Sequence, residues 1–142
     1  MNNSAKAPVA DLASLLHAAY AAQNDVEAKL GAIGLSLAKL AALKVLLDAD
    51  ESLPLTQVAE RLSCVKSNIT QLVDRLEADG FVKREADPRD RRARLATLTA
   101  AGRKACREGA RVQQAAEQSL LGRLSAVESR QLAELLAKIG AG

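Results

Sequence analysis

The sequence is poor in aromatic residues, with one Phe, one Tyr and no Trp among its 142 residues. A hydrophobic core must therefore be built from Leu, Ala, Val and Ile, and this composition favours packed helices. The scarcity of rings excludes a base-stacking platform for single-stranded nucleic acid, which needs several aromatic side chains. Histidine is equally scarce, since His17 is the only one, and this removes most His-based catalysis and zinc chemistry.

The sequence also lacks the patterns that mark enzymes, metal sites and membrane segments. The two cysteines, Cys64 and Cys106, lie 42 residues apart and form no metal-ligand motif. No nucleophile–base set or Gly-rich phosphate loop is present, so we predict no enzyme activity, no metal and no cofactor. Apolar runs are too short to span a bilayer, and Met1–Val9 has no long apolar core of the kind found in secretory signals. We therefore expect a cytoplasmic protein.

The hydrophobic periodicity predicts six helices and one β-hairpin, a mainly α fold with a small β component (α+β). Ser36, Thr56 and Ser125 are the predicted N-caps, and Gly80 is the predicted stop of the fourth helix. The helices are expected at about residues 12–30, 36–48, 56–62, 65–79, 100–121 and 125–140. The strands are expected at 81–84 and 94–98, joined by an Asp-Pro-Arg-Asp turn.

The third and fourth helices, joined by a tight turn, have the layout of a helix-turn-helix, and the hairpin adds a wing. On a helical wheel, the apolar residues of the fourth helix share one side and must face the core. A polar face at the other side of its first turns is typical of a recognition helix, which places such residues against base edges. A plain solvent-facing surface is the alternative. The predicted DNA contacts on this helix are Lys66, Ser67, Asn68, Thr70, Gln71 and Arg75.

The hairpin carries the most concentrated charge of the chain, because residues 81–94 hold six Lys and Arg residues against three acids. Arginine binds phosphate in a bidentate manner and enters narrow minor grooves, so we predict DNA contacts at Arg89, Arg91 and Arg92. Asp74 also lies toward the exposed side of the fourth helix, where a bare carboxylate would repel phosphates. We expect Arg92 or Arg94 to neutralise it, so that Asp74, Asp90 and Arg94 support the wing.

These segments resemble the MarR family of winged helix-turn-helix transcription regulators. The resemblance rests on Leu55–Leu62, on Ile69–Glu77 followed by Gly80-Phe81-Val82, and above all on the wing Asp87–Arg92 with the following Leu98–Gly102. It covers about residues 34–103. Two positions depart from the family pattern, because Ser63 stands where Gly is usual and Val65 stands where Ser is usual.

The resemblance implies a homodimer with two recognition helices, most often a repressor, with a ligand pocket between its DNA-binding and dimerisation parts. It divides the chain into an N-terminal helical dimerisation arm (1–33), a winged DNA-binding domain (34–99) and a C-terminal helical dimerisation region (100–142). The residues agree: the narrow apolar stripe of the first helix and the apolar face of the last have too few partners in one small winged domain. We expect a homodimer on a near-palindromic site with half-sites about 10 bp apart.

Two questions stay open at this point. His17 and Tyr20 are one turn apart on the first helix, so they could hydrogen-bond a small anionic or phenolic effector, or make polar interface contacts without a ligand. Cys64 near a helix N-terminus could sense oxidants, but it occupies a packing position, as does Cys106, and we expect structural roles for both. A different class of function, a helical protein–protein interaction module whose basic hairpin does not bind DNA, is the alternative to a DNA-binding regulator.

Overall fold

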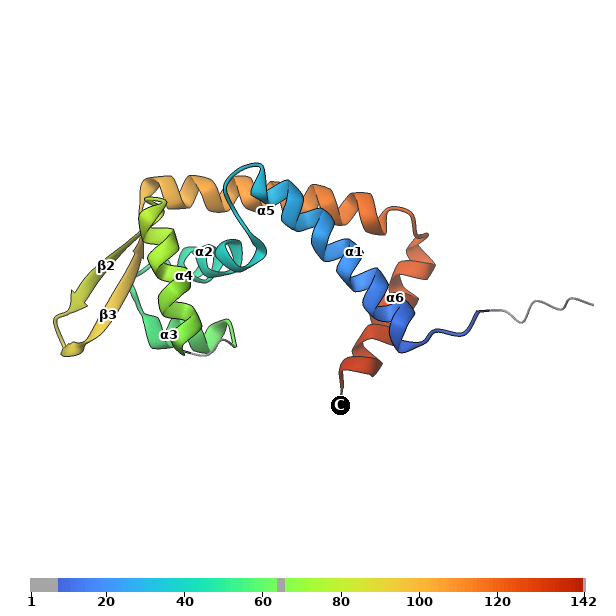
Figure 1. The fold of residues 1–142 in the computed structure, drawn as a ribbon, viewed down its shortest axis with the longest axis horizontal. Coiled ribbons are helices and arrows are strands. Elements are labelled where there is room, and N and C mark those ends of the chain that lie inside the picture. The colour runs from blue at the N-terminus through green and yellow to red at the C-terminus, as the bar shows by residue number, and fades with distance from the viewer. Residues whose placement is uncertain (1–7, 64–65, 142) are drawn as a thin grey trace, which may run out of the picture.

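The computed structural model describes residues 8–63 and 66–141. In this part of the chain it contains six α-helices and a small antiparallel sheet, so the predicted mainly α fold is confirmed. The molecule is an arch in which the long helix α5 spans from the winged part at one end to α1 and α6 at the other (Figure 1). The elements are α1 (Leu12–Gly31), α2 (Leu37–Ala49), β1 (Leu53–Pro54), α3 (Leu55–Arg61), α4 (Lys66–Ala78), β2 (Val82–Asp87), β3 (Asp90–Leu98), α5 (Ala100–Leu121) and α6 (Ala126–Gly140).

Local sequence signals fix most helix ends. The Ser36 side chain accepts a hydrogen bond from the backbone N–H of Lys39, and Ser125 forms the expected capping box with Glu128. The prediction of a cap at Thr56 is wrong. The N-cap of helix α3 is Pro54, two residues earlier, and it makes no side-chain cap hydrogen bond. Strand β1 runs directly into this helix, and the fixed φ of proline suits the transition.

The sheet has the order β1-β3-β2, so β3 is its central strand. Strands β2 and β3 are longer than the hydrophobic pattern predicts, because their register extends from Val82 opposite Leu98 to Asp87 opposite Asp90. The outer part of this hairpin is charged and largely exposed, and its backbone ladder rather than apolar packing holds the two strands together. Such a strand carries no period-2 hydrophobic signal, and the two-residue β1 was equally invisible in the sequence.

The core lies between α2, α4 and the sheet, and the N-terminal half of α5 covers it. The residues predicted to face inward on α4, namely Ile69, Leu72, Val73 and Leu76, are all buried. Two glycines allow α5 to approach closely. A Cβ at Gly102 would collide with the backbone carbonyl of Phe81, and one at Gly109 would come within 2.7 Å of the Leu35 side chain. The N-terminal half of α5 is therefore part of the winged unit, although it continues into the arm.

The arm is much less buried than the winged part. Every residue from Asp11 to Ala21 is exposed, and α6 has no buried residue. Large apolar side chains are nevertheless frequent there, and Leu12, Leu16, Leu135, Leu136 and Ile139 are all exposed. None of the helices in the described ranges is long and apolar enough to cross a membrane.

Candidate DNA-binding interface

Helix α4 presents a polar face opposite its buried apolar side. Its exposed residues include Asn68, Thr70, Gln71 and Arg75, four of the six predicted contact positions. Lys66 and Ser67 open the helix, but their side chains lie outside the described part of the structure. The amide groups on this face can pair with base edges in a major groove, and the guanidinium of Arg75 can pair with guanine or with phosphate.

Two shallow grooves flank this face. One, of about 280 Å³, lies between Ala38 of α2 and the α4 residues Gln71 and Arg75. The other, of about 210 Å³, brings Thr70 of α4 together with Arg92 and Arg94 of the hairpin. The N-terminal end of α4 and the tip of the hairpin lie on the same side of the molecule, opposite α5 (Figure 1). Among the described residues, the second groove therefore joins the exposed face of α4 at Thr70 to the hairpin at Arg92 and Arg94.

Two aspartates shape the tip of the wing. Asp87 Oδ1 accepts a hydrogen bond from the backbone N–H of Arg89 at 2.9 Å, and Asp90 Oδ1 accepts one from the backbone N–H of Arg92 at 2.9 Å. These side-chain turns stabilise the sharp reversal of the hairpin. Asp90 and Asp87 thus accept equivalent backbone hydrogen bonds on the two sides of the turn. The side chains of Arg89, Arg91 and Arg92 are exposed.

The expected partner of Asp74 was wrong. Arg84 of β2, and neither Arg92 nor Arg94, forms the ion pair, with its Nη1 at 2.6 Å from Asp74 Oδ1. Strand β2 follows α4 after a short turn and packs directly beside it, whereas Arg92 and Arg94 belong to the central strand β3. Arg94 lies nearby, and with Glu77 and Arg84 it lines a further open groove.

Arg84 also binds Glu77, one turn further along α4. Its Nη2 lies 3.0 Å from Glu77 Oε1, and its backbone N–H donates to Glu77 Oε2 at 3.0 Å. These hydrogen bonds, first from the guanidinium and then from the backbone, hold the pKa of Glu77 below its usual value. The same contact with Glu77 raises the pKa of Arg84, so the guanidinium stays charged. The i, i+3 spacing of Asp74 and Glu77, followed by a cation at the start of the hairpin, was the sequence signal for this clamp.

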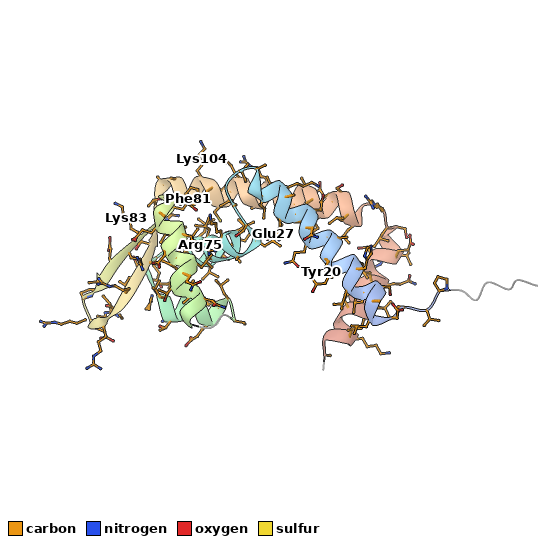
Figure 2. All side chains as sticks on the ribbon, in the orientation of Figure 1. Tyr20, Glu27, Arg75, Phe81, Lys83 and Lys104 are labelled. Carbon is orange, nitrogen blue, oxygen red and sulfur yellow. The ribbon has the colours of Figure 1, made fainter. Side chains whose placement is uncertain are left out.

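The proposed effector residues lie on the open surface of the arm. Tyr20 is 61% exposed and projects from α1 on the inner side of the arch (Figure 2), and His17 is also exposed. A separate, mostly apolar groove of about 300 Å³ lies where α1, the start of α2 and α5 meet, and it includes Val26, Leu37 and Glu117. Neither His17 nor Tyr20 lines this groove.

Cysteine and metal chemistry find little support in the described part of the chain. Cys106 is free but only 1% exposed, and burial raises the pKa of its thiol, which keeps it protonated near neutral pH. Cys64 lies outside the described residues. Among residues 8–63 and 66–141, no cluster of three or more His, Cys, Asp or Glu side chains could hold a metal ion.

Comparisons with known proteins point to one family. The MarR family profile matches residues 35–93. The transcriptional repressor Rv2887 of Mycobacterium tuberculosis is 31% identical over 116 residues, which are 82% of this chain and 83% of that protein. The regulator YkoM of Bacillus subtilis is 46% identical over a shorter stretch, 34% of this chain and 31% of that protein.

Solved structures agree with these matches. A cysteine-to-serine mutant of MarR from E. coli, crystallised in complex with operator DNA, superposes with a TM-score of 0.78 at 26% identity, covering 91% of this chain and 93% of that one. A probable transcriptional regulator from Pseudomonas aeruginosa gives a TM-score of 0.77 at 29% identity, covering 88% and 92% of the two chains. The chain belongs to the MarR family of transcription regulators, which are DNA-binding proteins without enzymatic activity.

Proposed function

We propose that the protein is a homodimeric, sequence-specific repressor that binds a near-palindromic operator. In each protomer α4 enters a major groove, and the wing contacts phosphates or an adjacent minor groove. The observation that carries this proposal is the common surface formed by the exposed face of α4 and the arginine-bearing tip of the hairpin. The similar MarR structure that is bound to operator DNA supports DNA binding by this fold. Binding of duplex DNA also favours a cytoplasmic location over a secreted one.

The exposed apolar residues of the arm support the homodimer. Leu12 and Leu16 on α1, with Leu135 and Leu136 on α6, are exposed in the single chain, and a two-fold contact between arms would remove them from water. We therefore assign residues 1–33 and 100–142 to dimerisation and residues 34–99 to DNA binding. The N-terminal half of α5 contributes to both parts.

Release by a small effector is the regulatory part of the proposal. The relative Rv2887 is named a repressor, and the arm groove at the start of α2 provides space for a small molecule. Glu117 in this groove disfavours an anion there. An anionic or phenolic effector is therefore better accommodated near His17 and Tyr20, in the dimer contact.

Selection from a randomised duplex library tests the function directly. Purified protein should enrich a two-part motif with half-sites about 10 bp apart, and sedimentation should give the mass of two chains on one duplex. Retention of no duplex at low salt would support the alternative of a protein–protein interaction module whose basic hairpin does not bind DNA. Retention of all duplexes alike would contradict sequence-specific binding.

A further inference from the structure

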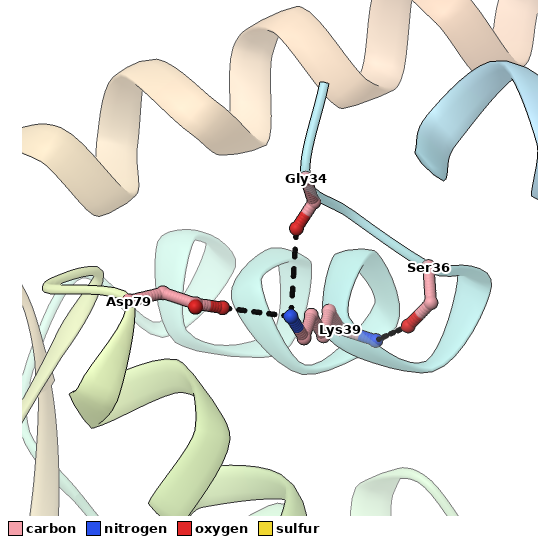
Figure 3. A network of polar contacts seen from close by, with 4 residues as sticks. All are labelled: Gly34, Ser36, Lys39 and Asp79. Atoms are coloured by element: carbon pink, nitrogen blue, oxygen red, sulfur yellow. Dashed lines mark hydrogen bonds and ion pairs between the residues drawn. The ribbon is translucent and has the colours of Figure 1, made fainter. Parts of the chain in front are cut away.

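The first turn of α2 connects the arm with the recognition helix (Figure 3). On one side, Glu27 Oε1 of α1 accepts a hydrogen bond from the backbone N–H of Leu37 at 2.8 Å. On the other side, Lys39 Nζ lies 2.7 Å from Asp79 Oδ2, just beyond the end of α4, and 3.4 Å from the carbonyl oxygen of Gly34. The arm, the loop after it and the recognition helix therefore meet at one helical turn.

The ion pair between Lys39 and Asp79 is partly shielded from water. Its side chains are 20% and 34% exposed, and it joins residues 40 positions apart. The pair between Lys29 and Asp25 is more exposed, at 44% and 40%, and it lies within one helix. Partial desolvation strengthens the attraction between charges. A pair between two elements also fixes their relative position, which a pair within one helix cannot do.

Asp79 is well placed to hold the direction of α4. Its backbone N–H bonds to the Arg75 carbonyl at 2.9 Å, so it continues the last helical turn. From Asp79 to Asn68 the helix rises about 16 Å. A tilt of about 12° around this end would shift the first turns of α4 by about 3.4 Å, the rise of one base pair. A tilt of this size, permitted by loss of the Lys39 contact, would therefore shift the first turns of α4 by one base pair on DNA.

The first turn of α2 and the loop before it also make contacts with the arm. Gly34 adopts a left-handed conformation with φ +77°, and the next residue, Leu35, is buried and bonds back to the carbonyl of Leu30. Leu37 lines the arm groove together with Val26 of α1. Displacement of α1 or occupation of this groove therefore acts on the same turn that holds Asp79.

We propose that Lys39 is a positioning residue that holds the recognition helix at a fixed angle to the arm and so sets the half-site spacing that the dimer accepts. This inference rests on the proposed dimeric mode of DNA binding. Lys39 contacts the C-terminal end of α4, remote from the base-reading turns, so its role differs from that of Gln71 or Arg92. Spacing discrimination should depend on it, and affinity for a single half-site should not.

The test compares three variants: Lys39→Met, Lys39→Arg, and a double variant that exchanges the charges by Lys39→Asp and Asp79→Lys. Lys29→Met is the matched control. The probes are the duplex selected by the wild type, the same duplex with one base pair added or removed between half-sites, and a single half-site duplex. Lys39→Met should lower the preference for the selected spacing by about fivefold, the factor expected from one ion pair, at unchanged half-site affinity. Lys39→Arg and the charge exchange should restore the preference, and Lys29→Met should match the wild type.

Hydrogen exchange of the free protein gives a readout that is independent of DNA. The amides of Asp79 and Gly80, which bond to α4 carbonyls, should exchange about fivefold faster in Lys39→Met and remain unchanged in Lys29→Met. An equal loss of affinity for all duplexes, an unchanged spacing preference, or unchanged exchange at these amides would each overturn the proposal. Failure of the wild type to bind any duplex would overturn the proposed function, and the exchange data would still decide whether Lys39 holds α4.

Discussion

Single residues on the DNA-facing surface differ in the kind of contact that they can make. Arg92 is exposed near the tip of the hairpin, and we propose that its charge contacts phosphates whatever the DNA sequence. Gln71 lies on the exposed face of α4, where its amide can pair with adenine. The first contact contributes to affinity in general, and the second contributes to sequence preference.

Arg92→Ala should weaken binding to all duplexes and flatten the dependence of affinity on salt. One phosphate contact contributes about −0.9 to the slope of log affinity against log salt concentration, so a dimer should lose about 2. Titrations between low and moderate salt measure this slope. An unchanged affinity and slope in the variant would contradict the phosphate contact.

Gln71→Ala is the matched control on the same surface. It should leave the salt slope unchanged and relax the preference at one position of each half-site by about 1–3 kcal/mol. Competition among duplexes that differ at single positions measures this preference. A change in slope as large as that of Arg92→Ala would mean that Gln71 does not read a base.

Ser63 stands where the MarR family usually has Gly, and its backbone conformation is unfavourable for a residue with a side chain. Its φ is +53°, in the left-handed region, which disfavours residues with a Cβ by roughly 1–2 kcal/mol. Ser63→Gly should therefore raise the free energy of unfolding by about 0.5–1 kcal/mol, since the flexibility of Gly in the unfolded chain offsets part of the gain. Urea denaturation measures the change. Ala115→Gly, in the exposed middle of α5, should instead lower it by about 1 kcal/mol, and a similar loss at Ser63 would contradict the argument.

At the scale of elements, the clamp of Arg84 on Asp74 and Glu77 makes the recognition helix and the wing one unit. A wing tied to α4 presents its arginines at a fixed distance from the base-reading residues. In the proposed complex the two sets of contacts would then form together, with less loss of conformational freedom than for a free wing.

The clamp predicts a specific pH dependence of stability. The pKa of Glu77 is lowered in the folded state, so its contribution is present above the ordinary glutamate pKa of 4.5 and is lost as pH falls through the lower folded value. Glu77→Gln should lower the urea midpoint at pH 7, and the difference from the wild type should shrink progressively below pH 4.5. Glu85→Gln, at an exposed glutamate of β2 next to Arg84, is the control and should change little. A difference between Glu77→Gln and the wild type that is constant with pH would contradict the role of the Glu77 charge.

Elements with strong periodicity could be predicted from the sequence, and contacts between elements could not. The buried side of α4 and the caps at Ser36 and Ser125 follow from spacing within one segment. The partner of Asp74 depends on which strand packs beside α4, and this is a property of the sheet order β1-β3-β2. The ion pair of Lys39 with Asp79 was missed for the same reason, because no local pattern relates residues that far apart.

At the scale of the whole molecule, the arm leaves large apolar side chains of α1 and α6 exposed in the single chain. The winged part buries its apolar residues within one chain, whereas α6 buries none. Helix α5 joins the two, so in the proposed dimer a contact between arms fixes where each winged part stands. The spacing of the two recognition helices would then depend on this contact and on the turn at Lys39.

The last prediction tests this dependence of DNA binding on the arm. Leu135→Glu with Leu136→Glu places two charges where we expect two arms to meet, and an unpaired buried charge costs about 3–5 kcal/mol. The dimer dissociation constant should rise by about a hundredfold or more. Sedimentation at micromolar concentration should then give single chains. Ala101→Glu, exposed on α5 above the winged part, adds a charge at a matched site and should leave the dimer intact. The winged part keeps its own core in both variants, so each chain should still bind a half-site weakly. A double variant that remains dimeric would place the interface elsewhere, and a monomer with full operator affinity would show that the two half-sites are bound independently.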